Sequence, residues 1–302
     1  MSRLKRLIDQ FASNAREKRV CVIGETIIDE FIDVKYEGQS MKSFCPVFRH
    51  AANGKERSRQ EGGASAIANH LRDFVKEVKL VTNPGNDIVK TRLIDRDDGK
   101  KHVEINRFDI KKFEPIEIDA KEYDVVIVAD FGHGFCDKLR VNGKFHFMTQ
   151  TNSNNFGYNR MSKWKAYPKK SACLDLREAS LQLNYKTDFA SREVVRELFN
   201  YEIGAEKLFL TLGRKGSVYF DGDRYVHQPA FKWNVVDTIG AGDTFYAFAC
   251  MAAEMNFDEN VEEIMLIPAL AASLSCTWLC NEEAVTLQKL IQHADRFVQD
   301  SL

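Results

Sequence analysis

The sequence lacks an excess of charge of either sign, because its 43 lysine and arginine residues are matched by 44 aspartate and glutamate residues. That balance gives no electrostatic reason to expect a nucleic acid as partner. The chain also lacks clustered metal ligands: its seven cysteines are scattered, with no Cys-x-x-Cys pair and no close Cys/His group. A zinc site is therefore not expected, and the thiols fit a reducing, cytoplasmic compartment.

The N-terminus lacks the apolar core of a signal peptide, since residues 1–19 carry charge along their length. One uncharged stretch, residues 264–280, is shorter than the ~20 apolar residues of a membrane span and contains Pro268 and Ser273. We predict a buried core helix there and expect no membrane association.

Short apolar runs alternate with segments of helical periodicity. The runs predict buried strands at 19–24, 77–82, 124–130, 145–150, 171–176 and 207–213. Helical segments are predicted at 64–75, 191–203, and, from Gly240 onward, about 240–255, 259–279 and 284–299. The alternation predicts an α/β domain with a doubly wound parallel sheet, helices on both faces, and ligands at the carboxyl ends of the strands.

Two stretches break the alternation. Residues 31–50 have the pattern of short strands, and residues 91–109 that of a hairpin with Asp98-Gly99 as its turn. Neither has a helix to cover it, so we predict a small antiparallel β lid built from about 31–60 and 91–109. Residues 51–63 are polar and contain glycine, which predicts a mobile loop. The chain, residues 1–302, is then a single domain with this lid.

Gly240-Ala241-Gly242 opens a helical segment, with Asp243 in its first turn. Small residues there let a ligand approach the backbone, and the free N–H groups and helix dipole favour an anion. A carboxylate in that turn could accept a proton from an attacking hydroxyl during phosphoryl transfer. An ordinary helix start, with aspartate favoured by the dipole alone, explains the same residues.

Residues 237–245, DTIGAGDTF, resemble the DTxGAGD signature of the ribokinase-like (PfkB) sugar kinases. GETIIDE (24–30), EGGASAIANHL (61–71) and TLGRKGSVYF (211–220) are similar to three further family elements and occur in family order. The resemblance implies the ribokinase-like fold and an ATP-dependent phosphotransferase with an alcohol acceptor. It implies Asp243 as general base, with the amides of Gly240, Ala241 and Gly242 on the transferring phosphoryl group.

The resemblance also implies the remaining binding residues. On the ATP side these are Thr211, Gly213, Gly216, Asp237 and Thr238, with a monovalent cation beside Asp237 in some relatives. On the sugar side they are Asp29, Gly62, Gly63 and Asn69.

The magnesium motif of the family is altered. Its usual Asn-x-x-Glu corresponds here to Asp175-Leu176-Arg177-Glu178, so Asp175 and Glu178 are the predicted Mg²⁺ residues. Oxygen ligands suit that ion, although the second carboxylate adds charge near ATP. A surface Asp and Glu at a helix start remain an alternative.

The run Asp130-Phe131-Gly132 is also found in protein kinases, where it holds magnesium. No HRD loop, VAIK strand, GxGxxG loop or Walker A motif accompanies it, so that interpretation fails. The segment instead resembles the DY-x-K-G turn of heptose 7-phosphate kinases, with His133 in place of lysine. The resemblance places Asp130 on the sugar side; a strand-to-helix turn with a solvent-facing histidine is the alternative.

The front half resembles the kinase half of the bifunctional heptose kinase/nucleotidyltransferases, and the chain stops before a transferase half. Residues 149–165 depart from that subgroup and offer Asn152 and Lys163 as candidate ligands for hydroxyls and for a substrate phosphate. A polar loop rich in turn-forming asparagine is equally consistent.

Together these observations predict an ATP- and Mg²⁺-dependent sugar kinase, with a heptose 7-phosphate or related sugar as acceptor and a homodimer formed through the lid. Two alternatives stay open. One is a kinase for another small alcohol, such as a ketose or nucleoside, since acceptor choice lies in the sugar-side loops. The other is a non-catalytic nucleotide or sugar sensor on the same fold.

Overall fold

The computed structural model describes residues 3–51, 56–84, 87–108, 113–151, 157–187, 190–255 and 260–299. Its main sheet has eight strands in the order β15-β14-β13-β12-β11-β9-β1-β5. Parallel strands are β1 (Arg19–Gly24), β5 (Glu77–Val81), β9 (Val125–Asp130), β11 (Phe145–Thr149), β12 (Lys169–Asp175) and β13 (Leu208–Thr211). All six lie where the apolar runs predicted them.

One edge of this sheet corrects the prediction of a wholly parallel sheet. β14 (Ser217–Phe220) and β15 (Tyr225–Gln228) run antiparallel to their neighbours. The chain reverses at Gly216, whose φ is +98° and where a Cβ would lie 2.0 Å from the carbonyl oxygen of Gln228. Only glycine fits this turn, which returns the chain directly to the sheet without a crossover helix.

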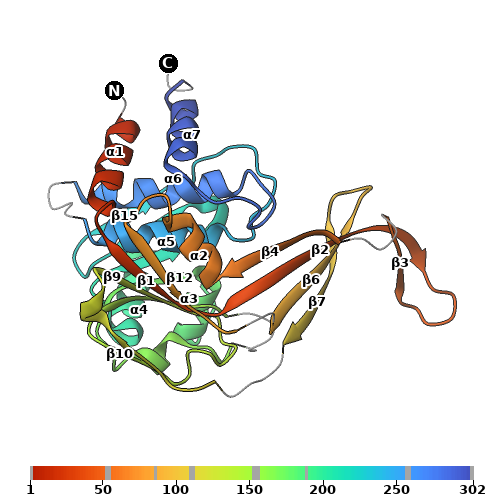
Figure 1. Ribbon diagram of the computed structural model, residues 1–302, viewed down its shortest axis with the longest axis horizontal. Coiled ribbons are helices and arrows are strands. Elements are labelled where there is room, and N and C mark those ends of the chain that lie inside the picture. Colours follow the sequence, from red (N-terminus) through yellow and green to blue (C-terminus); the bar gives the residue numbers. More distant parts are fainter. Residues whose placement is uncertain are drawn as a thin grey trace.

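Helices cover both faces of the sheet, as predicted (Figure 1). They are α1 (Arg3–Ala15), α2 (Ala64–Leu71), α3 (Leu176–Leu183), α4 (Arg192–Leu198), α5 (Ala241–Ala253), α6 (Leu266–Ser275) and α7 (Leu287–Gln299). In β1, Val20 and Val22 belong to one buried cluster while Cys21 and Ile23 belong to another, because alternate side chains point to opposite faces. The first cluster joins α1, α2, α5, α6 and α7, and the second joins α3 and α4.

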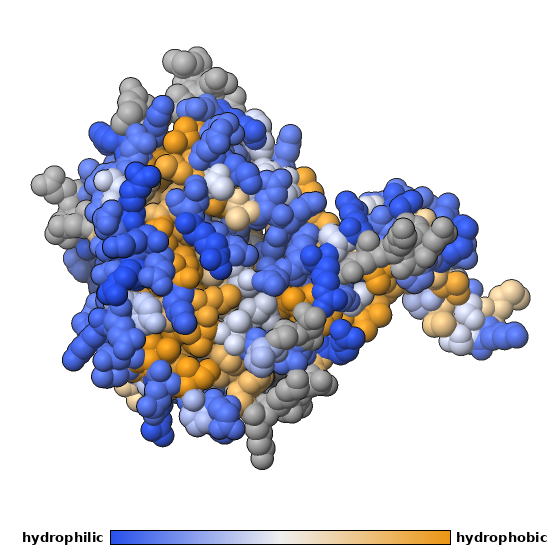
Figure 2. Space-filling model, viewed as in Figure 1, coloured by the Kyte–Doolittle hydropathy of each residue, from blue (hydrophilic) through white to orange (hydrophobic). Residues whose placement is uncertain are grey.

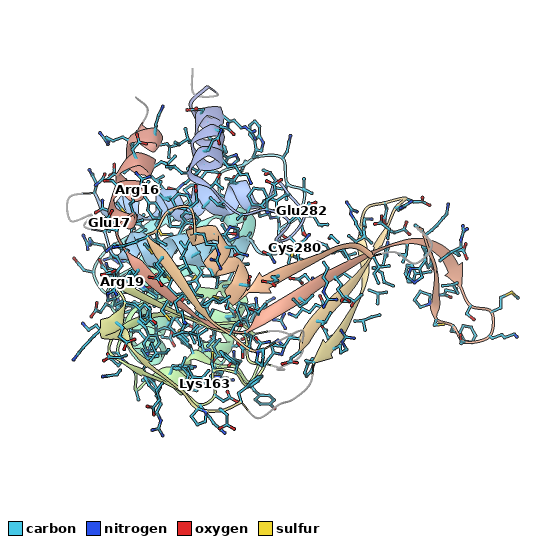
Figure 3. All side chains as sticks on the ribbon, viewed as in Figure 1. Arg16, Glu17, Arg19, Lys163, Cys280 and Glu282 are labelled. Atoms are coloured by element: carbon cyan, nitrogen blue, oxygen red, sulfur yellow. The ribbon has the colours of Figure 1, made fainter. Side chains whose placement is uncertain are left out.

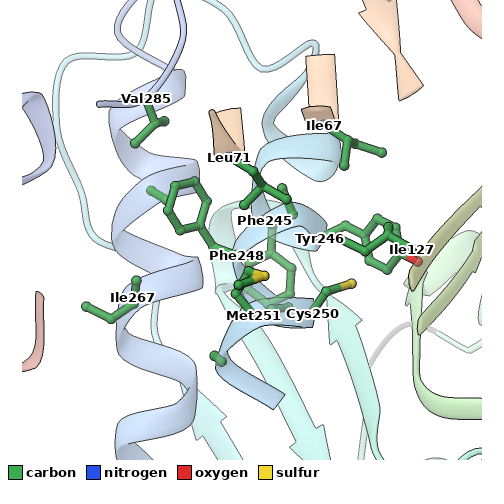
Figure 4. Packing of buried hydrophobic residues seen from close by; sticks show 14 of the residues in the cluster. Ile67, Leu71, Ile127, Phe245, Tyr246, Phe248, Cys250, Met251, Ile267 and Val285 are labelled. Atoms are coloured by element: carbon green, nitrogen blue, oxygen red, sulfur yellow. The ribbon is translucent and has the colours of Figure 1, made fainter. Parts of the chain in front are cut away.

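The centre of the first cluster is α5, which is buried from Thr244 to Ala253. Figure 4 shows Phe245 and Phe248 of this helix packed among Leu71 of α2 and Ile267 of α6. The predicted core helix at 264–280 is confirmed by α6, and among the described residues no helix is long and apolar enough to span a membrane. This packing fixes the direction of α5 and therefore the position of its N-terminus.

Shorter elements complete the body. β8 (Ile116–Asp119) and β10 (Leu139–Asn142) form a two-stranded sheet. Single turns of 3₁₀ or π helix are η1 (Ala120–Glu122), η2 (Met161–Trp164), η3 (Phe199–Ile203), η4 (Gly213–Lys215) and η5 (Val261–Met265).

A lid of five strands extends from one side of the body (Figures 1 and 2). Its strands are β2 (Thr26–Gln39), β3 (Pro46–His50), β4 (Glu56–Gly63), β6 (Ile88–Asp95) and β7 (Lys101–Phe108). The hairpin turn at Asp98-Gly99 is confirmed, with Gly99 at φ +69°. β2 and β6 pair in parallel, so the lid is mixed rather than antiparallel throughout.

The predicted loop at 51–63 was wrong from Glu56 onward, because β4 pairs antiparallel with β2. Its sequence, ERSRQEGG, has few strand-forming residues and no apolar alternation. The inward positions Gln60 and Gly62 lie opposite Asp29 and Ile27 of β2, beside the polar sugar-side residues. A strand with a polar, glycine-containing inner face carries no hydrophobic signal, and its pairing with β2 stabilises it instead.

Candidate active site

The N-terminus of α5 forms the candidate phosphate-binding turn. Gly240 has φ +84°, and a Cβ on it would lie 2.6 Å from Oδ1 of Asn281, so a side chain fits neither the conformation nor the space. Thr244 donates its hydroxyl to the carbonyl oxygen of Gly240 (3.0 Å) and contacts Nε2 of His70 (2.9 Å). Nδ1 of His70 accepts the N–H of Val285 (3.0 Å). This neutral ring of α2 therefore connects α5 with the segment before α7.

A cavity of about 540 Å³ opens in front of this turn. Its polar side includes six residues named in the sequence prediction: Asp175, Thr211, Gly213, Gly216, Thr238 and Gly242. Its apolar side includes Phe231, Trp233, Val235, Ala269 and Ala272. The first residue of α5, Ala241, also lines it. A cavity lined by apolar side chains and by the start of a helix suits a nucleotide, whose base stacks on apolar groups and whose phosphates are anionic.

Asp243 lies in the first turn of α5, partly exposed. Burial and the negative charge of Asp29 raise its pKa to about 7, and Lys90 acts in the opposite direction. A carboxylate whose pKa lies near neutrality can both accept and hold a proton at physiological pH.

The predicted metal residues Asp175 and Glu178 form a capping box at the start of α3. Asp175 Oδ1 accepts the N–H of Glu178 (2.7 Å), and Glu178 Oε2 accepts the N–H of Asp175 (2.8 Å). Glu178 Oε1 accepts the N–H of Thr151 (2.9 Å). Burial, and then the charge of Asp175, raise the pKa of Glu178 to about 8. Repelling carboxylates beside the cavity fit a hydrated Mg²⁺, since a cation relieves the repulsion.

On the sugar side, Asp29 of β2 lies beside Gly62 of β4. A Cβ on Gly62 would lie 2.6 Å from Asp29 Oδ2, so the absence of a side chain leaves room at this carboxylate. Arg92 of β6 pairs with Oδ1 of Asp29, and this charge raises the pKa of Arg92 although burial acts against it. Asn281 Nδ2 lies 3.5 Å from Oδ2 of Asp29, which links the lid to the segment after α6. Figure 3 labels the adjoining Cys280 at the base of the lid.

Two predicted sugar ligands, Asp130 and Lys163, are instead bonded to each other. Lys163 Nζ lies 2.7 Å from Asp130 Oδ2, which also accepts the indole N–H of Trp164 (2.9 Å). Asp130 Oδ1 accepts the amide of Asn159 (3.2 Å) and the N–H of Gly132 (3.0 Å). The Asp130 carboxylate is 1% exposed, so its oxygens serve the packing of this loop rather than a sugar.

Three more predicted sugar-side residues lie in different settings. Asn69 accepts a hydrogen bond from Arg72 Nε (3.0 Å) on the exposed side of α2, which is a local helix contact. Asn152 lies outside the described residues. Gly63 is a constrained position at the foot of the lid: its φ is +64°, and a Cβ there would lie 2.4 Å from the carbonyl oxygen of Glu25.

Glu25 and His133 belong to the same loop region, and neither was predicted as a site residue. The Glu25 carboxylate accepts the N–H groups of Phe131 (2.8 Å), His133 (3.2 Å) and Phe135 (3.1 Å). Burial and the charge of Asp130 raise the pKa of Glu25 to about 7. His133 packs against Phe108 of β7, and its Nε2 is buried without a hydrogen-bond partner among the described residues.

Sequence reasoning also missed Lys90, Arg92, Lys101 and Asn281. Lys90 and Arg92 share one face of β6, where they alternate with Val89 and Thr91, but the predicted hairpin began only at residue 91 and so left Lys90 out. Both are less than 10% exposed. Nothing local marks Lys101 or Asn281, whose partners are more than 100 residues distant.

Comparison with known proteins identifies relatives of part of the sequence and of the fold. Residues 170–278 match the family model for the pfkB family carbohydrate kinases. The deoxyribokinase of Salmonella typhi is 39% identical over 74 residues, which cover 24% of this chain and 24% of that protein. Alignments of this kind span about a quarter of the curated relatives' length.

Solved structures match along nearly the whole chain. The ribokinase of Thermotoga maritima superposes with a TM-score of 0.67 at 14% identity, covering 92% of this chain and 99% of its own. The Arabidopsis thaliana ribokinase complexed with ribose and ATP superposes with a TM-score of 0.59 at 15% identity, covering 92% and 98%. The fold is therefore ribokinase-like, and the part of the chain that holds the phosphate-binding turn carries the pfkB family signature.

Proposed function

We propose that this ribokinase-like chain, which matches the pfkB carbohydrate kinases over residues 170–278, is an ATP-dependent phosphotransferase with an alcohol acceptor. The observation that carries the proposal is the position of Asp243, directly behind a glycine turn that opens into a nucleotide-sized cavity and in electrostatic contact with the sugar-side Asp29. A group that can take a proton thus lies between the two binding regions.

In this scheme the N–H groups of Gly240, Ala241 and Gly242 hold the transferring phosphoryl group, because the start of α5 favours negative charge. Asp243 accepts the proton of the acceptor hydroxyl as it attacks. Asp175 and Glu178 hold Mg²⁺ and its waters, and the ion supplies charge neutralisation of the triphosphate when bound. Docking of the lid over the acceptor excludes water and limits hydrolysis of ATP.

The acceptor we propose is a sugar phosphate, with a heptose 7-phosphate as the leading candidate. Support comes from Lys90, which lies opposite Asp29 in the strand register, on the same face as Arg92. Its side chain makes no hydrogen bond or ion pair with another described residue, and burial lowers its pKa. The charges of Asp29, Glu104 and Asp243 favour its protonated form without a direct bond, so its donors can meet an anionic group on the ligand. The curated relatives do not address this choice, because their matches cover only about a quarter of the chain.

The experiment is acceptor-dependent ADP release with Mg-ATP across matched pairs of free sugars and sugar phosphates. We expect turnover with a phosphorylated sugar and much less with the corresponding free sugar. Lys90→Met should remove that preference while keeping turnover of free sugars. Equal rates on both members of every pair would refute the sugar-phosphate proposal and leave the kinase proposal intact, whereas ATP binding without ADP release would favour a sensor.

We also propose a homodimer formed through the lid. β3 and β7 are the edge strands of the lid sheet, and unpaired edges can join a second copy. Exposed large hydrophobic residues on the lid are Tyr36, Met41, Phe44 and Ile105. Light scattering should give the mass of a dimer, and Phe44→Asp should give a monomer while the exposed control Tyr185→Asp stays dimeric. A monomeric parent protein would refute the proposal.

A further inference from the structure

The lid and the loop before α5 are joined by an ion pair that the scheme above does not use. Lys101, the first residue of β7, places its Nζ 2.5 Å from Oδ1 of Asp237. The two residues are 136 positions apart in the sequence. Asp237 is 7% exposed and lies three residues before Gly240, so this lid residue contacts the base of the phosphate-binding turn.

The Asp237 carboxylate accepts four protein donors, three of them on Oδ1. Besides Lys101, Oδ1 accepts the N–H groups of Thr238 (2.8 Å) and Ile239 (3.3 Å), and Oδ2 accepts the N–H of Cys280 (3.2 Å). A carboxylate offers about four lone-pair sites. Oδ1 thus has more donors than its two lone pairs, and the Lys101 ammonium already supplies the positive charge there, so Oδ1 of Asp237 does not fit the separate monovalent cation that the family resemblance suggested.

We propose that the ammonium of Lys101 is a built-in cation that replaces a dissociable monovalent ion at Asp237. This inference rests on the proposed kinase function. An ammonium group carries the same charge as K⁺ and is close to it in size. The ammonium also lies 5.9 Å from the centroid of the Phe31 ring, which is within the range of a cation–π contact. Lys101 is therefore a positioning residue, held between the lid and the turn.

As a consequence, the phosphate-binding turn reaches its final arrangement at the same time as the lid docks. Asp237 fixes the backbone N–H groups of Thr238 and Ile239, which lead directly into Gly240. Its charge is balanced only when β7 brings Lys101 into place. A protein with this arrangement needs no added potassium, and its phosphate-binding turn is complete only when the lid covers the acceptor.

The test compares Lys101→Met with Lys100→Met, which removes the neighbouring, 75% exposed lysine of the same hairpin. Turnover and thermal unfolding are measured in KCl and in tetramethylammonium chloride at equal ionic strength. We expect the parent protein and Lys100→Met to behave identically in both salts. Lys101→Met should lose ~10- to 100-fold in turnover and ~3 °C in Tm in tetramethylammonium chloride, and KCl or NH₄Cl should restore much of both. A purely structural lysine would give the losses without the rescue.

Three outcomes would overturn the proposal: stimulation of the parent protein by K⁺, losses in Lys101→Met that neither KCl nor NH₄Cl restores, or a Lys101→Met variant with parental turnover and Tm in both salts. The Tm measurement needs no turnover, so it decides the question even if no acceptor is phosphorylated. Should Lys101→Met not fold, Lys101→Arg keeps the charge and should remain independent of K⁺; potassium stimulation of that variant would count against the built-in cation.

Discussion

Asp243→Asn should make the protein more stable at alkaline pH while removing most of its activity. The pKa of Asp243 is raised from 3.8 to about 7, chiefly by burial. Between those two pH values the folded protein holds a proton that the unfolded chain has released. The free energy of unfolding therefore falls as pH rises through this window, and the penalty is complete above pH 7.

The size of the effect follows from the shift. About three pKa units correspond to an upper bound of ~4 kcal/mol, at ~1.4 kcal/mol per unit. The residue is partly exposed, so solvent screens its charge, and we expect ~1–2 kcal/mol. Asparagine has the same shape and stays neutral. The variant should therefore exceed the parent in free energy of unfolding by this amount at pH 8 and by much less at pH 5.

The assay is urea denaturation of both proteins at pH 5 and pH 8. Asp9→Asn, an exposed carboxylate of α1, is the control and should change the free energy of unfolding by less than ~0.5 kcal/mol at either pH. In the parent, kcat/KM should rise about tenfold per pH unit up to about pH 7, because only the ionised base accepts a proton. An Asp243→Asn variant that is no more stable than the parent at pH 8 would refute the account of its buried charge.

Three further predictions concern neighbouring groups. Gly240→Ala should lower the free energy of unfolding by ~1–2 kcal/mol and kcat by ~10²-fold, because a Cβ there would lie 2.6 Å from Asn281. Gly38→Ala is the control, because Gly38 also has a positive φ but a Cβ there would meet no atom within 4 Å. Glu25→Gln should lower the free energy of unfolding by ~1–3 kcal/mol in urea, since one carboxylate oxygen that accepts two N–H groups is replaced by a donor. His70→Phe should lower the Tm by several degrees, since Thr244 and the N–H of Val285 lose their partner; an unchanged Tm would show that this ring is dispensable.

The elements of the body could be predicted because their signals are local. An apolar run marks a parallel strand, and the GAGD turn followed by a fully apolar helix marks the start of α5. β4 could not be predicted, since its stability comes from pairing with β2 and from no pattern of its own. Hydrophobic periodicity thus predicts which segments are buried in the core and says little about a lid made of a single sheet.

The candidate site divides in the same way. Residues of the nucleotide side lie in short motifs, so Thr211, Gly213 and Asp175 were predicted and do line the cavity. The sugar side depends on contacts between distant segments. Neither the pairing of Asp130 with Lys163 nor that of Lys101 with Asp237 has a local signature, because each unites two separate loops or strands.

The most direct test of the central claim is acceptor-dependent ADP formation measured side by side for the parent protein and Asp243→Asn at pH 8, with ATP binding recorded for both. We predict turnover in the parent, a loss of ~10²–10⁴-fold in the variant, and similar ATP affinity in the two. Turnover by the variant at the parental rate, or ATP binding without acceptor-dependent ADP formation in either protein, would contradict the assignment of Asp243 as the base of a phosphotransferase.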